Sequence, residues 1–322
     1  MQSDQKFVTH EIMHASIDRP SFFRVWVTAL RPFSFSASVM PVLLGTGMAW
    51  SYGYPFRVSP FFLLLASVIS LHAGANLLND YFDMARGLDR QVYPVSGALV
   101  RGWLGASQVW HVALVLLGVG LLLAILVVTL SGWGLVAVAL LGGLLAVSYT
   151  RKGLCLKYLG LGDPAILVAF GVLPVLAGWW VQAGDMSWVA IWWSVPSGLL
   201  AVGTLQASNW RDRHRDAAHG CRSLAVRLGA AGSRLYWQGI LLGALLLVPA
   251  FVLAGLFAPA RLYAPVGTLL ALLCLPAFAK MLVTDWPHEK NAFMQLDARM
   301  AQLHLVFTVL LCMGFLLARW CA

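Results

Sequence analysis

The chain has 322 residues, of which 60% are apolar and only 11% are charged, and its formal net charge is +9. Because a soluble domain carries about 25% charged residues, this composition excludes an ordinary soluble protein. The positive charges lie in short clusters between long apolar runs. This pattern indicates a protein embedded in a lipid bilayer, and it argues against a partner nucleic acid.

The N-terminal segment, residues 1–34, is polar and lacks the apolar core of a cleaved signal peptide. We predict a partly helical cytosolic segment that ends at Arg31-Pro32, followed by a single transmembrane domain over residues 35–322. The five cysteines show neither a CxxC pair nor metal-ligand spacing, so we expect them to be apolar fillers.

Nine apolar runs follow, each near the ~20 residues that a helix needs to cross a bilayer. They cover about 35–52, 59–79, 107–130, 132–150, 163–183, 187–208, 233–257, 262–283 and 303–320. Cytoplasmic loops are enriched in Lys and Arg, and of the 22 such residues only Arg57, Arg261 and Arg319 fall on the side opposite the N-terminus. We therefore predict an all-α, polytopic membrane fold with nine transmembrane helices and a cytoplasmic N-terminus.

Two polar clusters end apolar runs on the predicted cytoplasmic side, at residues 76–83 and 209–216. Residues three or four apart are neighbours on a helix, so each cluster places an asparagine and two carboxylates on one face. These are Asn76, Asp80 and Asp83 in the first cluster, and Asn209, Asp212 and Asp216 in the second. Carboxylates at membrane depth are costly and mark a functional site by default. The similar order of runs around the clusters predicts two similar halves that share one site.

The chemistry of these clusters favours Mg²⁺, which takes one or two carboxylates together with phosphate oxygens and water. Arginines and lysines around the acids suit a diphosphate, whose remaining oxygens they would bind. They are Arg86, Arg90, Lys152, Lys157, Arg211, Arg213, Arg215 and Arg222. The adjacent interior is rich in Trp, Phe and Leu, so we expect a substrate with a charged head and a long apolar tail, such as a polyprenyl diphosphate. Tyr81, Phe82 and Tyr149 are candidates to stabilise an allylic cation.

The stretches Asn76-Leu-Leu-Asn-Asp-Tyr-Phe-Asp83 and Asn209-Trp-Arg-Asp-Arg-His-Arg-Asp216 resemble the two Asp-rich motifs of the UbiA superfamily of intramembrane prenyltransferases. The form of the first motif resembles the 1,4-dihydroxy-2-naphthoate polyprenyltransferases. So do Leu156-Lys-Tyr-Leu-Gly-Leu-Gly-Asp163 and Gly220-Cys-Arg-Ser-Leu-Ala-Val-Arg-Leu-Gly229. The likeness runs from about residue 31 to the last helix and implies nine helices around a central cavity.

By this resemblance, the four aspartates hold Mg²⁺ and diphosphate, and the two asparagines orient them. Lys157 and Arg222 would contact the diphosphate, and Tyr149 and Asp163 would lie near the acceptor. Asp89 would be an outer member of the first motif. Three departures flank these regions: Tyr149-Thr-Arg-Lys-Gly153 replaces Tyr-Thr-Gly-Pro-Pro, Cys221 replaces a usual lysine, and Asp163 stands where Glu is commoner.

We therefore predict a Mg²⁺-dependent prenyltransferase of the inner membrane with its active site on the cytoplasmic face. The predicted acceptor is 1,4-dihydroxy-2-naphthoate, which loses CO₂ to give demethylmenaquinone. Alternative acceptors are 4-hydroxybenzoate, homogentisate, a haem or a chlorophyllide. His72 and His214 are candidate bases, although a simple hydrogen-bonded role is favoured for each.

Two other classes of membrane protein use Asp-held metals. The CDP-alcohol phosphotransferases need Asp-Gly-x-x-Ala-Arg, and Asp83-Met-Ala-Arg86 lacks that spacing. A cation transporter would place acids midway across the membrane, whereas these acids lie at one face.

Overall fold

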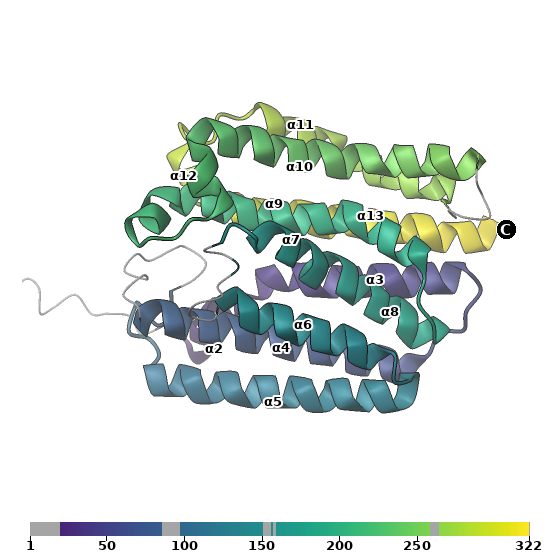
Figure 1. The fold of residues 1–322 in the computed structure, drawn as a ribbon, viewed down its shortest axis with the longest axis horizontal. Helices are drawn as coiled ribbons and strands as arrows, with labels where there is room; N and C mark the ends of the chain where they lie inside the picture. The colour runs from purple at the N-terminus through teal and green to yellow at the C-terminus, as the bar shows by residue number, and fades with distance from the viewer. Residues whose placement is uncertain (1–19, 86–96, 151–155, 157–158, 258–263, 322) are drawn as a thin grey trace, which may run out of the picture.

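The structure is a computed structural model that describes residues 20–85, 97–150, 156, 159–257 and 264–321. Over these ranges the chain is helical and contains no strand, as Figure 1 shows. The prediction of an all-α fold is therefore confirmed.

The elements up to α8 form the N-terminal half. They are α2 (Phe22–Leu30), η1 (Pro32–Phe35), α3 (Ser36–Ser51), α4 (Val58–Ala85), α5 (Ala106–Ser131), α6 (Leu135–Thr150), α7 (Gly162–Ile166), the π-helical turn η2 (Leu167–Val172) and α8 (Leu173–Ala183). The C-terminal half consists of α9 (Trp188–Ala218), α10 (Leu224–Phe257), η3 (Val266–Cys274), α11 (Leu275–Val283), α12 (Lys290–Phe293) and α13 (Leu296–Cys321). A positive φ of 69° at Gly229 bends the start of α10.

Eight helical segments within the described ranges are long and apolar enough to cross a membrane. A further apolar helix over Leu135–Tyr149 is shorter than the others. At 1.5 Å per residue, its length is about 22 Å, against about 30 Å for the hydrocarbon core. The chain is thus a multi-pass membrane protein, while the ninth span stays a prediction.

The helices that carry the two acidic clusters extend past the predicted apolar runs. The second run was predicted to end near residue 79, but α4 continues to Ala85, and α9 continues to Ala218. With 31 residues, α9 is about 46 Å long and exceeds the hydrocarbon core. Both acidic clusters are therefore the last turns of long helices, which confirms the helical spacing assumed for them.

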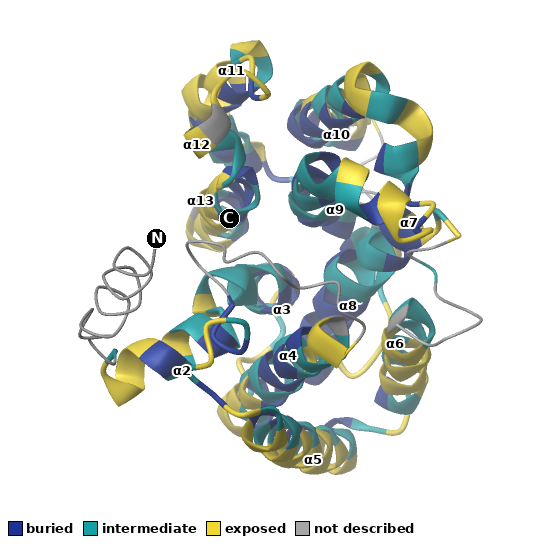
Figure 2. Ribbon diagram, turned by 90° about the vertical axis from the view of Figure 1, so that its left-hand side faces the viewer, coloured by how far each residue is buried: buried dark blue, intermediate teal, exposed yellow. Residues whose placement is uncertain are grey.

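The two halves of the chain lie side by side as layers in Figure 1, with α10 and α11 at the top and α4, α5 and α6 at the bottom. The end view in Figure 2 shows the most buried residues on the inner helices, including α3, α4 and α9. In the most apolar stretch of each helix, 61% of the residues are buried in α9 but only 17% in α5. The mean hydropathy of 3.0 for α5 indicates that its exposed side faces lipid.

Helices α3 and α8 approach each other closely through glycines. A Cβ atom on Gly45 would lie 2.0 Å from the carbonyl oxygen of Val175, and one on Gly178 would lie 2.3 Å from that of Val42. Small residues are enriched at such contacts because lipid gives helices no hydrophobic reason to associate, so close packing must hold them. This contact joins α3, in the core next to α9 and α13, to α8.

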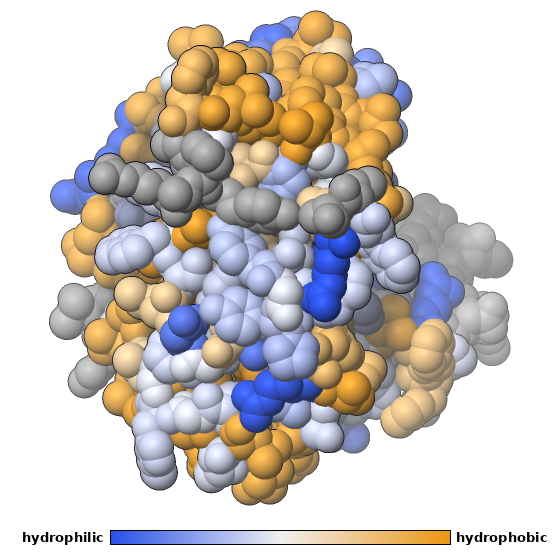
Figure 3. All heavy atoms as spheres, turned by 90° about the vertical axis from the view of Figure 1, so that its right-hand side faces the viewer, coloured by the Kyte–Doolittle hydropathy of each residue, from blue (hydrophilic) through white to orange (hydrophobic). Residues whose placement is uncertain are grey.

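The end of the bundle at the right of Figure 1 is viewed directly in Figure 3. Hydrophilic and intermediate residues gather in the middle of this face, and apolar residues lie above and below them. This distribution fits a bundle whose sides contact lipid and whose ends contact water.

Candidate functional site

The helix ends that carry the two acidic clusters lie at the same end of the bundle, at the left in Figure 1. The clusters come from different halves of the chain. Helix α2 and the start of α13 are at this end as well. The structure therefore agrees with the prediction that the two halves direct their acids to one end of the molecule.

In the first cluster, the carboxylate of Asp80 is buried, with 4% of the residue exposed. The guanidinium of Arg31, from the turn between α2 and η1, forms an ion pair with an oxygen of this carboxylate. Asn76 lies one turn earlier on α4, and its Nδ2 donates to the carbonyl oxygen of Leu30 at 3.0 Å and to Ser34 Oγ at 3.1 Å. The hydrogen bonds of Asn76 thus stabilise the turn from which Arg31 reaches Asp80.

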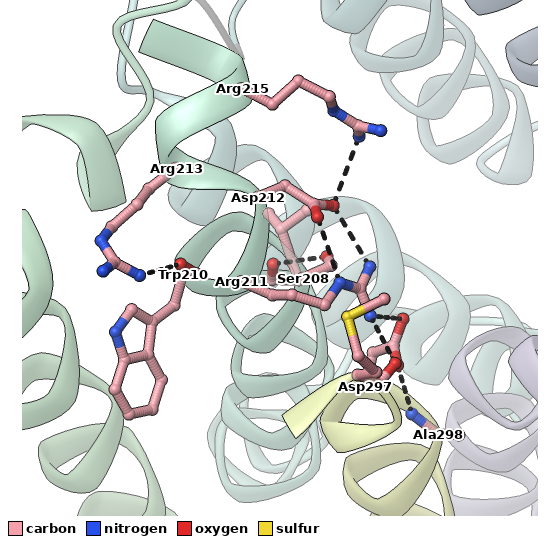
Figure 4. A network of polar contacts seen from close by, with 10 residues as sticks. Ser208, Trp210, Arg211, Asp212, Arg213, Arg215, Asp297 and Ala298 are labelled. Carbon is pink, nitrogen blue, oxygen red and sulfur yellow. Dashed lines mark hydrogen bonds and ion pairs between the residues drawn. The ribbon is translucent and has the colours of Figure 1, made fainter. Parts of the chain in front are cut away.

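In the second cluster, Arg211 and Asp212 form a two-pronged ion pair, with Nε–Oδ1 and Nη2–Oδ2 distances of 3.2 Å (Figure 4). Arg215 Nη2 lies 3.4 Å from Asp212 Oδ2. Arg211 Nη1 also reaches Asp297 Oδ2 on α13 at 3.0 Å. Asn209 and Asp216 are buried on the same helix. Asp212 therefore pairs with the guanidinium groups of both Arg211 and Arg215, as Figure 4 shows.

The first turns of α13 connect the two clusters. Asp297 contacts Arg211 of the second cluster. One turn later, about 6 Å along the helix, the carbonyl oxygen of Ala301 accepts a hydrogen bond of 3.5 Å from Ser36 Oγ. Ser36 follows η1, and η1 packs against both α13 and α4. A continuous path of contacts thus runs from the Arg31 turn to Asp212.

Asp163 is buried next to the second cluster. Its two carboxylate oxygens accept from Nε2 of Gln206 on α9 at 2.6 and 2.5 Å, and Tyr236 of α10 interacts with the same carboxylate. Gln206 precedes Asn209 by three residues, so both lie on one face of α9. The amide oxygen of Gln206 is buried and has no hydrogen-bond partner in the described part of the chain.

The other predicted site residues fall into two groups. Tyr149 is half-buried near the end of α6, and Arg222 is exposed between α9 and α10. The side chain of Asp83 lies outside the described residues, as do Asp89, Lys152 and Lys157 together with Arg86 and Arg90.

The predicted hydrogen-bonded role of His72 is confirmed by its contacts. Its Nδ1 lies 2.8 Å from Ser38 Oγ and its Nε2 lies 3.2 Å from Ser34 Oγ. The imidazole packs edge-on against Phe35 and Phe170, with ring centroids 5.4 and 5.3 Å away. His72 thus fastens η1 and the start of α3 to α4.

Three residues at this end of the bundle were not predicted from the sequence: Arg31, Gln206 and Asp297. For Arg31, the available signal was a charged residue directly before the proline that opens the transmembrane domain. For Gln206, it was a polar side chain one turn before Asn209, inside an apolar run. Asp297 is an acidic residue shortly before the last apolar run, and an acid at that position is equally expected in a solvated loop.

The donor atoms at this end are hard carboxylate oxygens, which suit Mg²⁺. Among the side chains that the structure describes, no three His, Cys, Asp or Glu residues lie close enough to form a complete metal site. Mg²⁺ usually takes one or two protein carboxylates and completes its shell with phosphate oxygens and water. The buried carboxylates of Asp80 and Asp216 and the partly buried carboxylate of Asp212 therefore fit an ion that binds together with a phosphate-containing ligand.

Comparison with known sequences identifies relatives for most of the chain. Residues 38–306 match the model of the UbiA prenyltransferase family. The 1,4-dihydroxy-2-naphthoate octaprenyltransferase of Escherichia coli is 32% identical over 251 residues, covering 72% of this chain and 78% of the relative. A UbiA prenyltransferase domain-containing protein 1 homolog of Drosophila melanogaster is 31% identical over 222 residues, covering 68% of this chain and 62% of the relative. The human UbiA prenyltransferase domain-containing protein 1 is 30% identical, covering 91% and 83%.

Solved structures share the fold. A UbiA homolog from Archaeoglobus fulgidus bound to DMAPP and Mg²⁺ superposes with a TM-score of 0.58 at 15% identity, covering 89% of this chain and 98% of that one. A UbiA homolog from Aeropyrum pernix gives a TM-score of 0.62 at 18% identity, covering 87% and 98%. The family match, the relatives and the fold agree with the two acidic clusters, and the chain belongs to the UbiA prenyltransferase family and is a membrane prenyltransferase.

Proposed function

We propose that this prenyltransferase transfers a polyprenyl chain from its diphosphate to 1,4-dihydroxy-2-naphthoate in a Mg²⁺-dependent reaction that releases CO₂ and diphosphate. The product is the reduced form of demethylmenaquinone. The observation that carries this proposal is that two acidic clusters, each paired with guanidinium groups, lie at the same end of an apolar helical bundle. The Escherichia coli relative that acts on this naphthoate, by its name, supports the choice of acceptor.

Asp80 and Asp83 on α4, and Asp212 and Asp216 on α9, would hold the metal ions. When bound, Mg²⁺ neutralises charge on the departing diphosphate. Arg211 and Arg215 already lie beside Asp212 and would bind diphosphate oxygens in the same place. Lys152, Lys157 and Arg222 keep their proposed role as further diphosphate contacts.

The acceptor would lie near Asp163, Gln206 and Tyr149. Gln206 holds the carboxylate of Asp163 with its amide nitrogen, which leaves its buried amide oxygen unpaired. A buried acceptor without a partner costs about 1–3 kcal/mol, so a ligand hydroxyl that donates to it gains binding energy. The two ring hydroxyls of a dihydroxynaphthoate are donors of this kind. In the reaction, the ring carbon that bears the carboxylate attacks the allylic carbon, and CO₂ leaves.

We place the enzyme in the inner membrane with its site on the cytoplasmic face. The distribution of Lys and Arg along the sequence supports this orientation, because only Arg57, Arg261 and Arg319 fall on the other side. Diphosphate and naphthoate would then reach the site from the cytoplasm, while the prenyl chain lies among the helices.

The test uses membranes that contain this protein, Mg²⁺ and a labelled polyprenyl diphosphate, with dihydroxynaphthoate and 4-hydroxybenzoate supplied separately. We expect a prenylated product and an equal amount of CO₂ from the naphthoate, and no product when EDTA removes the metal. Product from the hydroxybenzoate alone would contradict the proposed acceptor and retain the metal-dependent transfer. Homogentisate supplied in the same way would extend the comparison.

A further inference from the structure

The backbone of Arg31 has an unusual conformation. Its φ of 55° and ψ of 59° are left-handed, and it is the one non-glycine residue with a positive φ in the described part of the chain. The following residue is Pro32, which disfavours a helical conformation at the position before it. Such a conformation persists only where the surrounding structure enforces it, and it clusters at functional sites.

Several hydrogen bonds enforce this turn. The carbonyl oxygen of Arg31 accepts from the backbone nitrogen of Ser34 at 2.9 Å and from Ser34 Oγ at 2.8 Å. The backbone nitrogen of Arg31 donates to the carbonyl oxygen of Val27 at 3.1 Å. Asn76, from the first acidic cluster, donates hydrogen bonds to residues on both sides of the turn, to Leu30 before Arg31 and to Ser34 after it. The acidic cluster itself therefore fixes the residue that neutralises it.

The consequence is an ion pair between a partly exposed guanidinium and a buried carboxylate. The side chain of Arg31 is 26% exposed, whereas that of Asp80 is 5% exposed. A buried carboxylate needs a positive partner, and Arg31 supplies it from a turn that precedes the matched family region of residues 38–306. Arg211 differs from Arg31, because Arg211 lies on the same helix as its partner Asp212 and also pairs with Asp297.

We propose that Arg31 competes with the divalent cation for the carboxylate of Asp80, and that the displaced guanidinium then binds the diphosphate. Metal binding is therefore weak until the diphosphate arrives, because the diphosphate gives Arg31 a new partner. Arg31 is a positioning residue that makes metal and prenyl diphosphate bind cooperatively. This inference rests on the proposed metal site at Asp80.

The size of the effect follows from electrostatics. An arginine next to an aspartate lowers the affinity of that carboxylate for a proton by about 10–1,000-fold. A divalent cation feels the same repulsion at least as strongly. Removing the charge of Arg31 is therefore expected to tighten metal binding about tenfold in the absence of diphosphate. A turn that merely supported the fold would give an unchanged or weaker affinity on substitution.

The experiment measures the affinity of the purified protein for Mn²⁺, from the electron paramagnetic resonance signal of the free ion. Arg31→Asn removes the charge with a residue that tolerates the left-handed conformation, and Arg31→Lys keeps the charge. Arg24→Gln, on the exposed side of α2, is the matched control. Each protein is titrated alone and with an unreactive prenyl thiodiphosphate.

We expect Arg31→Asn to bind Mn²⁺ about tenfold more tightly than the wild type, and to gain less from the thiodiphosphate. Arg31→Lys should stay near the wild type, and Arg24→Gln should match it. Unchanged or weaker Mn²⁺ binding by folded Arg31→Asn would overturn the proposal. An Asp80→Asn variant separates the metal site at Asp80 from the role of Arg31. If Asp80→Asn keeps wild-type Mn²⁺ affinity, the proposed metal site is wrong. If Asp80→Asn weakens Mn²⁺ binding while Arg31→Asn leaves it unchanged, only the proposed role of Arg31 is wrong.

A second measurement needs no substitution. Phenylglyoxal modifies accessible arginines, and peptide mass spectrometry reports each site. If Mn²⁺ displaces Arg31 from Asp80, saturating metal should raise the modification of Arg31 several-fold and leave Arg24 unchanged. Equal modification of Arg31 with and without Mn²⁺ would contradict the displacement.

Discussion

At the scale of single residues, a buried and a partly buried carboxylate of this membrane protein lie beside guanidinium groups. Asp80 pairs with Arg31, and Asp212 pairs with Arg211 and Arg215. Such pairs lower the cost of burying charge, because each ion loses water but gains an opposite charge. The same arrangement keeps carboxylates and arginines close together. The carboxylates would bind the metal ions and the arginines the diphosphate oxygens, so the groups that now pair with each other are those proposed to bind the substrate.

The contact between Gln206 and Asp163 gives a prediction about the acceptor. Gln206→Leu removes both the donor to Asp163 and the unpaired amide oxygen, so binding of dihydroxynaphthoate should weaken. We expect its KM to rise about tenfold, equivalent to about 1.4 kcal/mol, with little change in the KM for polyprenyl diphosphate. Steady-state kinetics with each substrate varied in turn measures both. Ser208→Ala is the control, because the hydroxyl of Ser208 donates to the carbonyl oxygen of Leu205 on the same helix.

Equal increases in both KM values would show that Gln206 supports the fold and not the acceptor. An unchanged KM for the naphthoate in a folded Gln206→Leu protein would exclude the proposed hydrogen bond from the ring hydroxyl.

The sequence predicted the acidic residues and the arginines beside Asp212, but not Arg31 as the counter-ion of Asp80 or Asp297 as a partner of Arg211, for a physical reason. Asp80 and Asp212 are recognisable because carboxylates at the ends of apolar runs are costly. Arg31 could be placed only at the end of a polar segment, since its contact with Asp80 depends on a left-handed turn and on the packing of η1 against α4. Asp297 reaches Arg211 from 86 positions along the chain, and no local pattern encodes that meeting.

At the scale of helices, apolar runs predicted where helices lie better than where they end. The clusters at residues 76–83 and 209–216 were assigned to the ends of runs, and the structure places them inside α4 and α9. Hydropathy falls where polar residues begin, but a helix continues while its backbone hydrogen bonds are made. Periods of three and four residues within the clusters were the better indicator.

The glycines between α3 and α8 give a prediction about stability. A methyl group on Gly45 would meet the backbone of Val175, whereas a methyl group on Gly47 would lie 3.7 Å from a side-chain carbon of Leu316, which is ordinary van der Waals contact. Gly45→Ala should therefore destabilise the protein by on the order of 1–3 kcal/mol, through overpacking against a backbone that cannot move aside. Gly47→Ala, on the same helix, should be close to neutral.

Thermal unfolding in detergent, followed by the intrinsic fluorescence of the tryptophans, measures both variants. A lower melting temperature for Gly45→Ala than for Gly47→Ala is expected. Equal melting temperatures would show that the approach of α3 and α8 is looser than the structure indicates.

At the scale of the whole molecule, the proposed site draws on both halves of the chain. Helix α4 belongs to the lower layer in Figure 1 and α9 to the upper one, and their motif-bearing ends lie at the same end of the bundle. Helix α13 contacts α9 through Asp297 and the start of α3 through Ala301, and so forms a bridge between the two halves. The similar order of runs in each half predicted a shared site, and the position of both clusters at one end of the bundle agrees with it. That order gave no indication of the bridge, which depends on how the last helix packs.

The most direct test of this account measures the release of diphosphate from a labelled polyprenyl diphosphate, in membranes supplied with dihydroxynaphthoate and Mg²⁺. The wild type is compared with Asp80→Asn, Asp212→Asn and the double variant. If both carboxylates serve one metal-dependent site, each single variant should lose activity by on the order of 100–1,000-fold, and the double variant should lose little more. Wild-type release by either single variant, or full activity of the wild type in EDTA, would contradict a shared site at Asp80 and Asp212.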